Sequence, residues 1–242
     1  MKAVEIRSLR KSFGKVKALD GLDLDIETGQ VFGIIGPNGS GKTTAIRILC
    51  GLLKADGGRA TVIGHEAGSR KYLPRIGYMP QETALYEDLT VEESLKLFAR
   101  VHGISKREFK ENEKKVLEMV DLYDRRDFLI SELSGGQKHR ISLAASMIHS
   151  PDLLFLDEPT VGVDPPLRAR FWNTFNELKR SGVTIVMSTH YMDEAKNCDR
   201  IAMMRMGRVI TQGSPDLIMR RTKTENLENA FLYMVQGEGV MS

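Results

Sequence analysis

One short stretch of the chain has the residue types and spacing of a loop that binds phosphate. It consists of Gly36, Pro37, Asn38, Gly39, Ser40, Gly41, Lys42, Thr43 and Thr44. The glycines permit backbone conformations in which successive N–H groups point at one anion. Lys42 would place its ammonium beside the β- and γ-phosphates of a nucleotide. Thr43 would offer its hydroxyl to Mg²⁺, which prefers oxygen ligands.

The segments on either side support this prediction. Val31–Ile35 is a continuous apolar run, typical of a strand buried on both faces. Residues 44–49 are predicted to form a helix that Gly51 closes. A glycine-rich turn that arose by chance would not be expected to have both a buried strand before it and a helix after it. The dinucleotide pattern G-x-G-x-x-G is absent, which argues against a Rossmann site.

Two adjacent carboxylates, Asp157 and Glu158, follow another apolar run, Leu153–Leu156. A buried strand in an α/β protein delivers such residues to the edge of the sheet where ligands bind. We expect Asp157 to join the Mg²⁺ shell and Glu158 to polarise the water that attacks the γ-phosphate. Acidic residues often end strands without a function, so this prediction gains its weight from the phosphate loop.

A third motif, Leu133-Ser134-Gly135-Gly136-Gln137, begins a predicted helix. Serine followed by two glycines offers a hydroxyl and free N–H groups to an anion, although alone it would indicate an ordinary N-cap. With the other two motifs, in this order, the sequence resembles the nucleotide-binding cassettes of ABC transporters. The resemblance extends from about Val4 to Gly213.

The resemblance implies an enzyme that binds and hydrolyses ATP with Mg²⁺ and dimerises head-to-tail around two nucleotides. The second cassette would be another copy or a paralogue, and its ATP would be contacted in trans by Ser134, Gly135, Gly136 and Gln137. The pair would drive a separate transmembrane permease that docks near residues 81–89, with Leu85 and Tyr86 as apolar contacts.

The same resemblance assigns roles to single residues. Phe13 would stack on adenine, or would be a core aromatic if the resemblance misleads. Gln81 would contact Mg²⁺ or the water, and Asp164 would lie at the dimer interface. His190 would sense the γ-phosphate. The catalytic set is thus Glu158, His190, Lys42 and Gln81, and the metal set is Thr43, Gln81 and Asp157.

The expected fold is α/β: a P-loop NTPase core with a mixed sheet, an antiparallel N-terminal β portion and an inserted helical subdomain. Further buried strands are predicted at 76–79, 183–187 and 201–204. Helices are predicted from Thr90, over 106–122, after Ser134 and over 165–178. These elements give a core of 1–86 and 150–213, a helical subdomain of 87–149 and a short helical tail of 214–242.

The amino-acid composition limits the kinds of partner that we expect for this chain. A net charge of +3 gives no reason to expect nucleic acid, and the two distant cysteines are expected to be reduced thiols. No apolar run approaches the ~20 residues that span a bilayer. We therefore expect another chain to supply the membrane part, with this one peripheral on the cytoplasmic face of the cell membrane.

The branch of the family is indicated by two segments, His190–Ala195 and Asn226–Leu232. Both resemble the exporter branch that includes ATPases of the drug-resistance type. Alternatives are an importer ATPase, a soluble ATPase such as an iron–sulfur assembly subunit, and a cassette that binds ATP without hydrolysing it. The transported molecule is not encoded in this chain.

Overall fold

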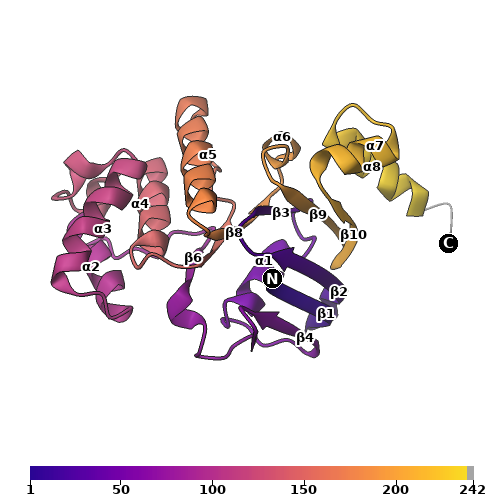
Figure 1. The fold of residues 1–242 in the computed structure, drawn as a ribbon, viewed down its shortest axis with the longest axis horizontal. Helices are drawn as coiled ribbons and strands as arrows, with labels where there is room; N and C mark the ends of the chain where they lie inside the picture. The colour runs from indigo at the N-terminus through magenta and orange to yellow at the C-terminus, as the bar shows by residue number, and fades with distance from the viewer. Residues whose placement is uncertain (239–242) are drawn as a thin grey trace.

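The computed structural model describes residues 1–238 and contains two sheets and several helices (Figure 1). The strands are β1 (Lys2–Phe13), β2 (Val16–Glu27), β3 (Val31–Ile35), β4 (Gly57–Val62), β5 (His65–Glu66), β6 (Ile76–Met79), β7 (Leu153–Asp157), β8 (Thr184–Thr189), β9 (Arg200–Arg205) and β10 (Arg208–Gly213). The helices are α1 (Lys42–Leu49), α2 (Val91–Val101), α3 (Lys106–Met119), α4 (Gly135–Met147), α5 (Pro165–Arg180), α6 (Met192–Ala195), α7 (Pro215–Thr222) and α8 (Leu227–Glu238).

The larger sheet is six-stranded, in the order β10-β9-β3-β8-β7-β6. Its strands run parallel from β9 to β6, and β10 alone pairs antiparallel. Strands β3, β7 and β8 are buried along their whole length, which explains their continuous apolar sequences. The predicted mixed sheet is therefore confirmed.

The smaller sheet is four-stranded, in the order β2-β1-β4-β5, and its β1–β2 and β1–β4 pairs are antiparallel. In strand β2, the buried side chains of Leu22, Leu24 and Ile26 alternate with aspartates. Helix α1 lies between the two sheets and shares one apolar core with them. This core covers one face of β3, through Phe32 and Ile34, and a second core covers its other face, through Val31 and Ile35.

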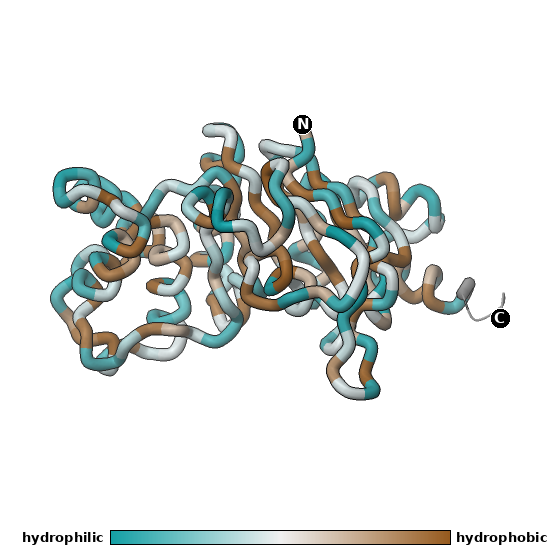
Figure 2. The backbone as a smooth tube through the Cα atoms, turned by 90° about the horizontal axis from the view of Figure 1, so that it is seen from below, coloured by the Kyte–Doolittle hydropathy of each residue, from teal (hydrophilic) through white to brown (hydrophobic). Residues whose placement is uncertain are grey.

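Helices α2, α3 and α4 follow β6 and form a compact group beside the parallel sheet, at the left of Figure 1. Each begins at a side-chain cap: Thr90, Ser105 and Ser134 all form capping boxes. Their apolar faces share a core with the other face of the large sheet. In Figure 2, short apolar stretches alternate with hydrophilic ones along the chain.

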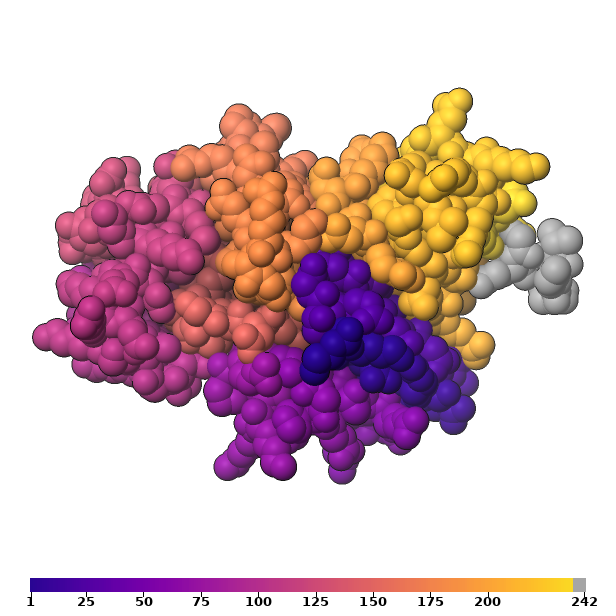
Figure 3. All heavy atoms as spheres, viewed as in Figure 1, coloured from indigo at the N-terminus to yellow at the C-terminus, as the bar shows by residue number. Residues whose placement is uncertain are grey.

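At the far end from α2 and α3 (Figure 3), helix α7 packs beside β10, and α8 packs on α7 and α6. Within residues 1–238, no helix combines the length and apolar character needed to cross a bilayer. Both cysteines, Cys50 and Cys198, are buried free thiols, as predicted.

Gly77 of β6 shows how closely α4 packs on the sheet. A Cβ atom there would lie 2.0 Å from the carbonyl oxygen of Ser146 on α4. We expect Gly77→Ala to lower the free energy of unfolding by at least about 2 kcal/mol, because neither backbone can move aside without cost. Urea unfolding followed by far-UV circular dichroism measures this difference.

Gly135 provides the matched control, since a Cβ there meets nothing within 4 Å and its φ is not positive. Gly135→Ala should change the free energy of unfolding by less than about 0.5 kcal/mol. Equal stability of the two variants would contradict the packing described for β6.

Candidate nucleotide-binding site

The phosphate loop joins β3 to α1 and is shaped by close backbone contacts. A Cβ on Gly36 would lie 2.3 Å from the carbonyl oxygen of Met204. Gly41 adopts a φ of 104°, a left-handed value, and no side chain caps the helix that follows it. The first N–H groups of α1 are therefore available to an anion at the loop.

Lys42 is buried and folds back over this loop. Its Nζ donates to the carbonyl oxygens of Gly36 at 2.8 Å and Pro37 at 3.1 Å. Burial lowers the pKa of the Lys42 ammonium, and the nearby carboxylates of Glu158 and Asp157 oppose that shift. The ammonium thus lies where phosphate oxygens held by the loop would contact it.

Asp157 ends β7 in a fully buried position. Its Oδ1 accepts hydrogen bonds from the hydroxyls of Thr43, at 3.1 Å, and Ser188. Its Oδ2 is buried and has no hydrogen-bond partner among the described residues. A buried carboxylate oxygen normally has a partner, so the Asp157–Thr43 pair suits a small divalent cation with oxygen ligands.

Glu158 lies between two polar side chains. Its Oε1 is 3.1 Å from Nδ1 of His190, and its Oε2 accepts from Nε2 of Gln81 at 3.4 Å. The Glu158 carboxylate is almost fully buried, whereas Gln81 is exposed. Three residues predicted separately from the sequence therefore form one cluster next to the phosphate loop.

The third motif lies at the start of α4. The Ser134 hydroxyl accepts from the backbone N–H of Gln137, and the Gln137 side chain accepts from the Ser134 N–H. Ser134, Gly135 and Gly136 are exposed to solvent. This corner of α4 is therefore open to a ligand or to another chain.

Comparison with known proteins agrees with this geometry. The family model described as ABC transporter matches residues 19–161. The chain belongs to the ABC transporter family. The expected α/β cassette fold is confirmed by a solved ATP-binding subunit of an ABC transporter, which aligns over 96% of this chain and 99% of its own, with a TM-score of 0.89 and 27% identity.

Two curated relatives illustrate the family. The Nod factor export ATP-binding protein I of Rhizobium sp. (strain N33) is 40% identical over 90% of this chain and 72% of its own length. The probable multidrug ABC transporter ATP-binding protein YbhF of Escherichia coli (strain K12) is 38% identical over 96% of this chain. The chain spans only 41% of the length of YbhF.

A further solved cassette was captured as a dimer in a post-hydrolysis state, bound to ADP and inorganic phosphate. It is 25% identical, with a TM-score of 0.80, over 87% of this chain and 98% of its own. The comparison thus includes a cassette whose nucleotide had already been cleaved.

Within the cassette, Phe13 is the last residue of β1 and is 52% exposed. The alternative that Phe13 is a core aromatic is therefore wrong. Lys11 Nζ lies 5.6 Å from the centre of its ring. An exposed ring of this kind can stack on a nucleotide base.

Asp164, predicted at the dimer interface, is exposed and caps α5 by accepting from the N–H of Leu167 at 3.0 Å. Away from this cluster, His102 and His149 stack on each other with ring centres 3.6 Å apart. His149 also bonds to the carbonyl oxygen of Ile76 at 2.8 Å.

Sequence reasoning gave no role to two residues that contact the site, Ser188 and His139. Ser188 pairs with Asp157 across β7 and β8, and also contacts the backbone of Glu158. His139, on α4, contacts the backbone carbonyl of Glu158. The His139 contact has no local sequence signal, whereas the position of Ser188, two residues before the predicted His190 at a strand end, could have indicated its role.

The unpartnered oxygen of Asp157 leads to a prediction. Asp157→Asn should lower hydrolysis of ATP more than 100-fold, by about 3 kcal/mol in barrier, because it removes the anionic ligand for Mg²⁺. ATP affinity without Mg²⁺ should change little. Phosphate release and binding of a fluorescent ATP analogue, with and without Mg²⁺, measure both effects.

Asp152→Asn serves as the control, because Asp152 is an exposed carboxylate paired with Arg75 near the other end of β7. A Mg²⁺ dependence in Asp157→Asn equal to that of the control would contradict the assignment of Asp157.

Proposed function

We propose that the chain is the ATP-hydrolysing subunit of an ABC exporter. It would work as a head-to-tail dimer with two Mg²⁺-ATP at the interface and drive a separate permease. The observation that carries the proposal is the cluster around Glu158. A buried carboxylate beside the phosphate loop, placed by Gln81 and His190, is suited to orient a water for in-line attack.

Dimerisation is supported by the placement of the third motif. Ser134 to Gly136 are exposed at the start of α4, on a different element from the phosphate loop. A second cassette could present the γ-phosphate of its ATP to this helix start, where free N–H groups favour an anion. The dimeric solved cassette agrees with such an assembly.

Each catalytic residue has a chemical task in this proposal. Lys42 and the loop N–H groups would neutralise the β- and γ-phosphates, and Mg²⁺ would be held by Thr43 and Asp157, with Gln81 beside it. Glu158 would accept hydrogen bonding from the attacking water, and His190 would contact the γ-phosphate and keep Glu158 in place. Phe13 would stack on adenine.

The export direction rests on the relatives. One is named for Nod factor export and another as a probable multidrug transporter protein. Because this chain covers less than half of the multidrug relative, the transported molecule and the permease are not transferred from it. The alternatives are an importer ATPase and a soluble assembly ATPase, and association with the membrane distinguishes a transporter subunit from the soluble ATPase.

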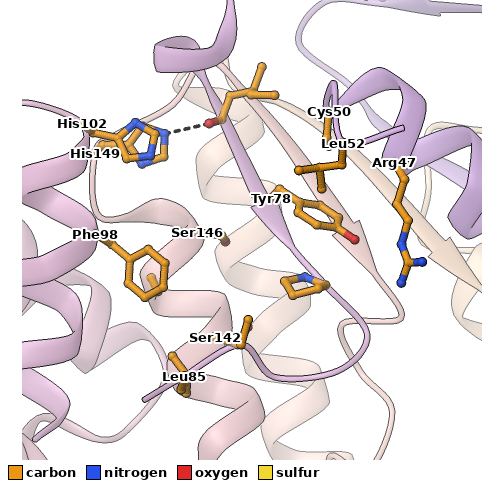
Figure 4. A pocket seen from close by; sticks show the side chains of 14 residues that line it. Arg47, Cys50, Leu52, Tyr78, Leu85, Phe98, His102, Ser142, Ser146 and His149 are labelled. Carbon is orange, nitrogen blue, oxygen red and sulfur yellow. Dashed lines mark hydrogen bonds between the residues drawn. The ribbon is translucent and has the colours of Figure 1, made fainter. Parts of the chain in front are cut away.

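The permease dock is proposed for the groove between the sheet and α2. A cavity of about 480 Å³ lies there, lined on its apolar side by Tyr78, Leu85 and Phe98 (Figure 4). Arg47 and His102 lie at its ends, and none of its lining residues is acidic. Leu85 lines this groove, whereas Tyr86 is exposed and is not one of the lining residues. A helix end from a permease would bury apolar side chains here.

Glu158→Gln tests the proposed hydrolysis. It should keep ATP binding and lower turnover at least about 100-fold, because an amide cannot take the proton of the attacking water. The uncleaved ATP should then trap the dimer. Phosphate release and size-exclusion chromatography with Mg²⁺-ATP measure these two results; turnover at the parent rate would sink the assignment of the base.

Leu85→Glu tests the dock. A buried charge in the groove should weaken permease binding, so the tagged chain should move from the membrane fraction to the soluble fraction. Phosphate release by the purified chain should stay within about twofold, because Leu85 lies outside the catalytic cluster.

Leu232→Glu is the control, since Leu232 is an equally apolar residue, half exposed, on the distant α8. Loss of membrane association in this control as well would contradict the proposed dock. An unmodified chain found only in the soluble fraction would favour the soluble ATPase.

A further inference from the structure

A buried imidazole on α4 contacts the backbone of the proposed catalytic glutamate. Nε2 of His139 lies 3.3 Å from the carbonyl oxygen of Glu158. A carbonyl oxygen only accepts hydrogen bonds, so Nε2 must carry the hydrogen. Burial lowers the pKa of His139, and its hydrogen bonds to the backbone carbonyls of Glu158 and Pro159 only partly offset this shift.

The backbone of Glu158 needs support because of its conformation. Its φ is 55°, in the left-handed region that residues with a Cβ seldom adopt. Such a conformation persists only where surrounding contacts determine it. On one side, the Glu158 N–H donates to Ser188, whose Oγ is 3.0 Å away. On the other side, the carbonyl accepts from His139 and from the N–H of Val161 at 3.3 Å.

The placement of α4 makes this contact significant. The helix starts at Ser134, and a Cβ on Gly136 would lie 3.7 Å from the carbonyl oxygen of Gly162. The first turns of α4 therefore lie against the loop that follows β7. The His139 hydrogen bond therefore connects α4, which begins with the Ser-Gly-Gly motif, to the peptide that orients the Glu158 side chain.

We propose that His139 is a positioning residue for ATP hydrolysis, which holds the Glu158 peptide so that the carboxylate stays between Gln81 and His190. The proposal rests on the function proposed above. His139 contacts the backbone carbonyl of Glu158 and not its carboxylate, so it acts through the position of Glu158. Losing its N–H should therefore slow the chemical step and leave ATP binding intact.

The test compares two substitutions of the same residue. His139→Leu keeps a buried apolar volume and removes the donor. His139→Gln keeps an N–H donor at nearly the same distance from the backbone. We expect His139→Leu to lower kcat about tenfold, the effect of one lost hydrogen bond at a positioned group, with KM changed less than about twofold. His139→Gln should recover most of the rate.

Ile141→Val is the matched control, because Ile141 is a buried residue on the same helix without a polar group. It should keep the parent kcat, and thermal unfolding should verify that all three variants are folded. If His139→Leu does not fold, His139→Met takes its place, with the same expected loss of kcat.

Several outcomes overturn the role of His139. The first is a kcat of His139→Leu equal to that of the parent. The second is a loss of kcat in His139→Gln, or in Ile141→Val, as large as that in His139→Leu. In each of these cases the unmodified chain still hydrolyses ATP and the proposed function stands. An unmodified chain that releases no phosphate from Mg²⁺-ATP overturns the proposed function and the role of His139 together.

Discussion

The site depends on how two consecutive carboxylates leave the end of one buried strand. In an extended strand, neighbouring side chains point to opposite faces, so Asp157 and Glu158 would normally diverge. The left-handed φ of Glu158 breaks this alternation. Both carboxylates then lie close enough to Lys42 to influence its pKa. One local departure from strand geometry thus brings the two carboxylates, proposed above as metal ligand and base, to one edge of the sheet.

Burying these charges opposes folding unless they are paired or hydrogen-bonded. The cost of burying Asp157 is offset by hydrogen bonds from the hydroxyls of Thr43 and Ser188. The cost of burying Glu158 is offset by its contacts with Gln81 and His190. The compensation is incomplete, since one oxygen of Asp157 has no partner among the described residues. A site of this kind gives up some stability of the free protein in favour of affinity for a charged ligand.

The parts of the site that could be predicted are those whose chemistry is local. A phosphate loop needs glycines, lysine and threonine within one turn, so the sequence of 36–44 indicates both its shape and its ligand. Helix starts at Thr90 and Ser134 were predictable for the same reason, because a capping box spans four residues. The order of the strands and the long β1 lacked such local signals.

The remaining contacts depend on elements that are distant in sequence. Ser188 meets Asp157 because β7 and β8 are adjacent in that register, and the strand order is set by packing. His139 meets Glu158 because α4 packs on the loop after β7. The left-handed φ of Glu158 could not be predicted from the sequence either, because glutamate, unlike glycine, gives no indication of such a conformation.

Helix α1 has a consequence for how the molecule transmits force. It starts at Lys42 in the phosphate loop, and Arg47 and Cys50 at its other end line the groove beside α2. The helix has eight residues, so nucleotide and groove are separated by only about 12 Å of hydrogen-bonded backbone. Two turns are too short to bend appreciably. The helix therefore moves as one body, and a displacement of the loop at its start also repositions Arg47 and Cys50 beside the groove.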